Sequence, residues 1–141
     1  MQDITAGKLI DHAGNPAGIH DSVKIVGIYF SAHWCPPCRN FTPVLAQAYT
    51  EHNENGQTLE IVFATSDQDE DSFQTYFKTM PWIALAFEDA KIKALKTKFA
   101  VNGIPRLVII NKATGEVIND NGRGDVQTNG PQAFADWASK C

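Results

Sequence analysis

The chain has 141 residues, of which 43% are hydrophobic and 20% charged, and its formal net charge is −4. This length and composition are typical of a globular protein with a real core, so we expect one domain over residues 1–141. The acidic balance argues against nucleic acid as a partner. The first ten residues lack the basic and apolar runs of a secretory signal or membrane anchor, so we expect neither secretion nor a membrane partner.

The first half of the chain predicts two buried strands with a long helix between them. Residues 24–30 (KIVGIYF) and 59–65 (LEIVFAT) are short runs rich in β-branched side chains. A helix is expected from about Pro36, because proline is tolerated in a first helical turn. It should end within residues 52–56, where Gly56 supplies a stop signal.

The second half continues the alternation of helices and strands. This alternation predicts an α/β fold with a parallel sheet, to which a late hairpin adds an antiparallel edge. The weakest order is expected in residues 119–131, which are rich in Gly and Asn. The expected elements are a helix within 66–80, a short extended piece at 82–87, a helix within 88–101, a strand at 106–111, a turn and a strand within 112–118, and a terminal helix at 131–140.

The pair Cys35-Pro36-Pro37-Cys38 follows the first strand directly and has three possible roles: a metal clip, a structural disulfide or a redox centre. Three cysteines are too few for a disulfide scaffold. In a chain without a secretory signal the expected compartment is reducing, which favours a catalytic or metal-binding pair over a structural one.

The position of the pair favours redox chemistry. Cys35 is expected at the start of the helix, where unpaired N–H groups and the helix dipole stabilise a thiolate, the species that attacks disulfides. Cys38 lies one turn further on nearly the same face and can resolve a mixed disulfide. A zinc site needs a second pair of ligands. His33 is too close in sequence to complete a tetrahedron and Cys141 is a lone distant thiol, so we expect no metal and no other cofactor.

Pro105 precedes the strand at 106–111 directly and cannot belong to a central ladder. One interpretation is an ordinary trans proline in a loop. The other is a cis Ile104–Pro105 bond in a tight turn. The Cys-x-x-Cys pair upstream favours the cis bond. Such a turn would leave the backbone of Ile104 free to pair with an extended substrate strand.

Three segments together resemble the thioredoxin superfamily, and more specifically its nucleoredoxin and tryparedoxin branch. They are YFSAHWCPPCRNFTP (29–43), SFQTYFKTMPWIALAF (72–87) and GIPRLVIIN (103–111), within a similarity that extends over residues 24–122. The resemblance implies a thioredoxin-like α/β fold, in which a central mixed β-sheet is flanked by α-helices. It also implies protein-disulfide oxidoreductase activity in the cytoplasm or nucleus.

The resemblance assigns roles to three residues: Cys35 is the nucleophile, Cys38 the resolving cysteine, and Pro105 the cis-proline that faces them. One departure concerns proton transfer. Thioredoxin has a buried aspartate at the position of Tyr29. That carboxylate therefore cannot accept the proton of Cys38 in this chain. The remaining candidate acceptors are Tyr29 and water, and tyrosine is a poor base at neutral pH.

Three further side chains are candidates for substrate contact. Trp34, beside Cys35, is either an exposed platform for substrate or a residue packed over the helix start. Trp82 either borders the active-site groove, as the resemblance implies, or fills the core. Arg106, which follows the proline, either favours acidic substrate segments or faces solvent.

Two functions of different class are consistent with the sequence. The first is a dithiol reductase of protein disulfides, a peroxiredoxin among the candidate substrates, that draws electrons from a dithiol or a reductase. The second is a redox-sensitive binding module that uses the same groove. Both cysteines and the cis-proline favour the enzyme. Thioredoxin reductase, glutathione and trypanothione all remain candidate donors, and we expect a monomer.

Overall fold

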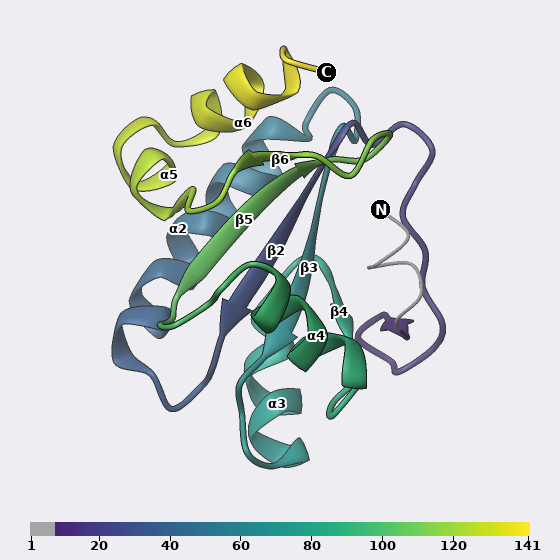
Figure 1. The fold of residues 1–141 in the computed structure, drawn as a ribbon, viewed down its shortest axis with the longest axis vertical. Coiled ribbons are helices and arrows are strands. Elements are labelled where there is room, and N and C mark those ends of the chain that lie inside the picture. Colours follow the sequence, from purple (N-terminus) through teal and green to yellow (C-terminus); the bar gives the residue numbers. More distant parts are fainter. Residues whose placement is uncertain (1–7) are drawn as a thin grey trace.

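The computed structural model describes residues 8–141, in which six strands form one mixed sheet in the order β1-β4-β3-β2-β5-β6 (Figure 1). The expectations of a single domain and of no leader segment include residues 1–7, which lie outside this part. The strands are β1 (Leu9–Ile10), β2 (Ile25–Ser31), β3 (Leu59–Thr65), β4 (Ile83–Leu85), β5 (Arg106–Asn111) and β6 (Val117–Asn119). The helices are α2 (Pro36–His52), α3 (Glu70–Phe77), α4 (Ala90–Lys98), α5 (Arg123–Asn129) and α6 (Pro131–Ala138).

The centre of the sheet consists of β2 and β3, which confirm the two predicted buried strands. All seven residues of each strand are buried, because helices cover both faces of the sheet. The two strands pair in parallel, and β5 pairs with β2 in the antiparallel sense with Arg106 opposite Phe30. The start of β5 therefore lies beside the end of β2, next to the loop that carries the two cysteines.

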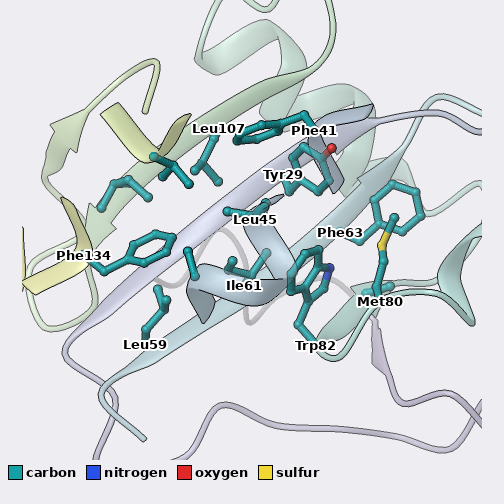
Figure 2. Close-up of a cluster of buried hydrophobic side chains, with 14 of the residues drawn as sticks. Tyr29, Phe41, Leu45, Leu59, Ile61, Phe63, Met80, Trp82, Leu107 and Phe134 are labelled. Atoms are coloured by element: carbon teal, nitrogen blue, oxygen red, sulfur yellow. The ribbon is translucent and has the colours of Figure 1, made fainter. Parts of the chain in front are cut away.

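The period-2 alternation of β2 divides the core into two clusters. Ile25 and Tyr29 belong to a large cluster under α2, α3, α5 and α6, and Figure 2 shows Tyr29 there among other aromatic and aliphatic side chains. Val26 and Ile28 belong to the opposite cluster, which α4 covers with Ile92 and Leu95. Because a packed cluster covers each face of the sheet, the end of β2 is held in place, and the loop that carries the cysteines extends from it.

The direction of β5 differs from a simple parallel arrangement. The strands β2, β3 and β4 are parallel, but β5 is antiparallel to β2. The nine residues of α4 span about 13 Å, close to the ~14 Å across the three strand spacings from β4 to β5. The length of α4 is therefore suited to carrying the chain across the sheet rather than back along it.

Residues 119–131 contain a helix, so the expectation that they have the weakest order is wrong. α5 occupies positions 123–129, and its Val126 is fully buried in the large core cluster. Gly122 is buried directly before α5, where a Cβ would come within 2.8 Å of the Trp137 ring on α6. Burial against α2 and α6 thus orders a segment whose composition alone favours a loop.

Candidate active site

The two cysteines lie at the start of α2, as the sequence predicts. Cys35 is the N-cap residue in extended conformation, and Pro36 and Pro37 occupy the first two helical positions. Those positions suit proline because their N–H groups have no partner inside the helix. The strand, the short loop and the proline-initiated helix therefore place the Cys35 side chain at the positive end of the α2 dipole.

The environment of Cys35 favours attack from its sulfur. The side chain is 6% exposed, and its Sγ accepts the N–H of Cys38 at 3.4 Å. The same Sγ lies 3.9 Å from the carbonyl oxygen of Ile104. An N–H donor at a helix start is the kind of group that stabilises a thiolate.

Cys38 has a different environment because it is fully buried. Burial raises the pKa of its thiol from 9.0 to about 11, and the hydrogen bond with Cys35 adds to this rise. Both cysteines are free thiols in this structure. The Cys38 thiol therefore keeps its proton near neutral pH and must lose it before it can act as a nucleophile.

The Ile104–Pro105 peptide bond is cis, which confirms the prediction from the sequence. Pro105 is buried, and the partly buried side chain of Ile104 packs against Cys35 and Cys38. Residues 69 apart in sequence are thus brought into contact by the antiparallel pairing of β5 with β2.

Asp67 fixes the loop that carries the cysteines, a role that the sequence analysis missed. It is 8% exposed, and its carboxylate accepts the main-chain N–H of His33 at 2.8 Å and the hydroxyl of Thr65 at 2.8 Å. These bonds join the end of β3 to the active-site loop. The available signal was an aspartate two residues after a buried strand, although the neighbouring acidic residues at the start of α3 obscured it.

A groove of about 250 Å³ is lined by Trp34, which precedes Cys35, and by Ile104, which contacts Cys35, and is the candidate substrate surface. Trp34 is 57% exposed beside it, and its ring N–H donates to the carbonyl of Ser66 at 3.2 Å. The Lys96 ammonium donates to the hydroxyl of Ser66, and partial burial lowers the pKa of this lysine. The lining residues are Trp34, Ser66, Lys96, Val101, Asn102, Gly103 and Ile104.

Trp82 and Arg106, which the sequence suggested as substrate contacts, do not line this groove. Trp82 is only 1% exposed and packs in the core against Tyr29 and Tyr49, so of the two interpretations the structure supports core filling (Figure 2). The Arg106 guanidinium donates to the carbonyls of Asp120 and Phe99, at 2.6 and 3.4 Å. Arg106 therefore connects two loops by hydrogen bonds. The sequence analysis considered only contact with substrate or with solvent, and did not predict this role.

Four buried hydroxyl groups lie beneath Cys38, and the sequence analysis did not bring them together. Tyr29 and Ser31 come from β2, Thr42 from α2 and Tyr76 from α3, and neighbouring oxygens are 2.6–2.8 Å apart. Burial raises the pKa values of both tyrosines, so neither side chain is a base at neutral pH. No sequence signal connects residues so far apart, since only the fold of α3 over β2 joins them.

Residues 8–141 were also considered for two other kinds of feature, a metal site and a membrane-spanning helix, and show neither. In this part of the chain no three His, Cys, Asp or Glu side chains gather in a way that could hold a metal ion. Among the same residues, no helix combines the length and the apolar character needed to cross a membrane.

A dithiol at a helix start that faces a cis-proline directly before β5 is an arrangement of the thioredoxin-like class of proteins. A family model described as thioredoxin-like matches residues 22–117, more than half of the chain. The chain therefore belongs to the thioredoxin-like family, and its relatives include proteins named nucleoredoxin and tryparedoxin.

The sequence relatives match most of this chain. Nucleoredoxin from Mus musculus is 46% identical over 133 residues, which cover 89% of this chain but 29% of that protein. Tryparedoxin from Trypanosoma brucei brucei is 44% identical over 101 residues, or 71% of this chain and 69% of that protein. The chain spans less than a third of the length of the nucleoredoxins that it matches.

Solved structures confirm the thioredoxin-like fold. Tryparedoxin I from Leishmania major superposes with a TM-score of 0.82 at 37% identity, covering 92% of this chain and 90% of that chain. A tryparedoxin II complexed with glutathionylspermidine gives a TM-score of 0.80 at 32% identity, covering 90% of this chain and 88% of that chain.

Proposed function

We propose that the chain reduces protein disulfides through Cys35 and Cys38. The Cys35 thiolate attacks a substrate disulfide, forms a mixed disulfide and releases the first substrate sulfur as a thiolate. The Cys38 sulfur then attacks the Cys35 sulfur, which forms the Cys35–Cys38 disulfide and releases the second substrate thiolate. Two electrons pass from the dithiol to the substrate, and an external dithiol or reductase returns them.

The difference between the two cysteines carries this assignment. Cys35 keeps 6% of its surface exposed at the helix start, with its sulfur beside the N–H of Cys38, whereas Cys38 has no exposed surface. A substrate can therefore reach only the first sulfur. The second sulfur lies within the same helical turn and is placed to attack from inside.

The groove beside Cys35 supports recognition of an extended substrate segment. Within residues 8–141 the N–H of Ile104 donates to no protein acceptor, and its carbonyl faces only the Cys35 sulfur. Both groups are therefore available to a strand laid along the cis-proline turn. Trp34 offers an exposed ring at the other side of the groove. Main-chain recognition of this kind predicts a broad range of substrates.

Candidate substrates are disulfide-containing proteins, peroxiredoxins among them, and the candidate donors are a reductase or a small dithiol. The complex of a tryparedoxin II with glutathionylspermidine supports a small thiol as a candidate partner. We propose action as a monomeric single domain in the cytoplasm or nucleus. A redox-sensitive binding module would use the same groove, but it would show no turnover.

Insulin reduction with dithiothreitol as electron donor tests the proposal and separates the two functions. We expect Cys35→Ser to abolish turnover and Cys38→Ser to accumulate a mixed disulfide with the substrate. Cys141→Ser is the matched control, because this exposed thiol at the end of the chain lies outside the site. Turnover by Cys35→Ser at the rate of the parent protein would overturn the assignment. A parent protein that binds the substrate without reducing it would favour the binding module.

A further inference from the structure

The groove beside Cys35 carries one charged side chain. Of the seven described residues that line it, only Lys96 is charged, and it is positive in a chain whose formal net charge is −4. The Lys96 ammonium donates to the hydroxyl of Ser66, and the carbonyl of Ser66 accepts the ring N–H of Trp34 at 3.2 Å. Lys96, Ser66 and Trp34 therefore form one hydrogen-bonded wall of the groove.

The end of α4 fixes the main chain of Lys96 at this wall. The N–H of Val101 donates to the carbonyl oxygen of Lys96 at 2.9 Å. The N–H of Ala100 donates to the carbonyl oxygen of Thr97 at 3.2 Å, and Ala100 has a φ of 51°. Two such bonds around a residue of positive φ form a Schellman motif. Lys96 is thus held in the last turn of α4, where the helix dipole favours a cation.

No carboxylate of residues 8–141 forms an ion pair with Lys96, whose ammonium donates only to Ser66 within this part of the chain. The carboxylate of Asp67 instead accepts the N–H of His33 and the hydroxyl of Thr65. The carboxylate of Asp89 accepts two main-chain N–H groups, one of them at the start of α4. The other charged residues that line the cavity on α4 beside Lys96 are Asp67, Glu88, Asp89 and Lys93.

The donors left over at this wall indicate the chemistry of a ligand. An ammonium has three N–H donors, and Lys96 uses one of them on Ser66. The hydroxyl of Ser66 accepts that bond, and its own proton goes to no acceptor within residues 8–141. An ammonium N–H and a hydroxyl O–H are therefore free side by side. A carboxylate offers two acceptor oxygens and the opposite charge, so it matches both donors.

We propose that Lys96 and Ser66 bind the carboxylate of an Asp or Glu side chain that lies within two residues of the cysteine in the substrate disulfide. This inference rests on the proposed function, since it adds a preference to the substrates of the same groove. A groove of about 250 Å³ is about 6 Å across, the length of about two extended residues. A segment paired with Ile104 at Cys35 therefore brings its neighbouring side chains to the wall. Arg106 cannot serve in this way, because its guanidinium is bonded to two main-chain carbonyls.

Short peptides whose single cysteine is joined to thionitrobenzoate test this preference in a Cys141→Ser background. Cys35 attacks the peptide sulfur, and thionitrobenzoate leaves with the electron pair of the broken S–S bond. Cys38 then bonds to Cys35 and releases the peptide thiolate. The peptides carry Glu or Gln at one of the two positions on either side of the cysteine. Each rate is divided by the rate of dithiothreitol with the same peptide, which corrects for the reactivity of the peptide itself.

At one of these positions Glu should raise the rate of thionitrobenzoate release roughly three- to tenfold over Gln, between the effects of an exposed ion pair and of a charged hydrogen bond. The adjacent positions should show no preference, because successive side chains of an extended segment point to opposite faces. Lys96→Met should bring the ratio of the Glu and Gln rates to about one, and Lys96→Glu should make a Lys peptide faster than the Glu peptide. Lys93→Met is the matched control, because it removes the same charge from α4 outside the groove and should keep the ratio.

The outcomes separate the carboxylate site from the proposed function itself. Equal rates for Glu and Gln peptides at all four positions would refute the site, and this result needs no variant to fold. An equal preference for Glu at all four positions would also refute it, since that pattern indicates attraction by overall charge, as would equal losses in Lys93→Met and Lys96→Met. A background protein that releases no thionitrobenzoate from any peptide would instead refute the proposed function.

Discussion

The burial of Cys38 predicts a large difference in reactivity between two thiols of the same chain. Iodoacetamide reacts with the thiolate. The pKa of Cys38 is raised from 9.0 to about 11, and two pKa units lower the thiolate fraction at neutral pH by about a hundredfold. Cys141 is exposed and serves as an internal reference. We therefore expect Cys38 in the reduced protein to be alkylated at least about a hundredfold more slowly than Cys141, since burial adds steric protection.

Mass spectrometry of peptides from timed alkylation reactions measures the initial rate at each cysteine. Cys35 should be modified before Cys38 throughout the neutral range, and the rate at Cys38 should rise with pH. In urea the three cysteines should react at similar rates, because the burial that raises the pKa of Cys38 is lost. Alkylation of Cys38 as fast as Cys141, or faster than Cys35, would contradict the assigned roles.

Two further predictions concern stability and are measured by urea denaturation. Asp67→Ala should lower the free energy of unfolding by about 1–3 kcal/mol, because the N–H of His33 loses its acceptor. A loss below about 0.5 kcal/mol would exclude an anchoring role, since even an average hydrogen bond is worth that much. Gly122→Ala should cost about 1–3 kcal/mol, because the added Cβ would lie 2.8 Å from the Trp137 ring. Gly124→Ala, which meets nothing within 4 Å, is its control and should stabilise α5 by about 0.5–1 kcal/mol; equal effects of the two glycine variants would contradict the packing argument.

The cysteine pair could be assigned from the sequence because its chemistry depends on local geometry. A strand, two prolines and a helix lie next to one another in the chain, and they place Cys35 at the N-cap with Cys38 one turn inside. Hydrogen bonds at a helix start form between residues only a few positions apart. The same locality explains why the runs in β2 and β3 predicted buried strands.

The surroundings of the pair could not be assigned in this way. Ser31 and Tyr76 are 45 residues apart, and their hydroxyls meet only because α3 packs over the end of β2. Asp67 resembles the other acidic residues that precede α3, until the fold shows its carboxylate on the active-site loop. The position of Trp82 was also ambiguous. An aromatic residue near a motif can line a groove or fill the core, and only its burial in the folded protein distinguishes the two.

The sequence by itself determined the strands from β2 onward, most helices, the dithiol and the proline turn, because each follows from patterns within a few residues. The tertiary structure decided how these parts face one another. The antiparallel pairing of β5 brings the cis-proline to the cysteines, and burial against α2 and α6 orders α5. It also decided the raised pKa of the Cys38 thiol, because that rise comes mainly from burial, which only the folded protein provides.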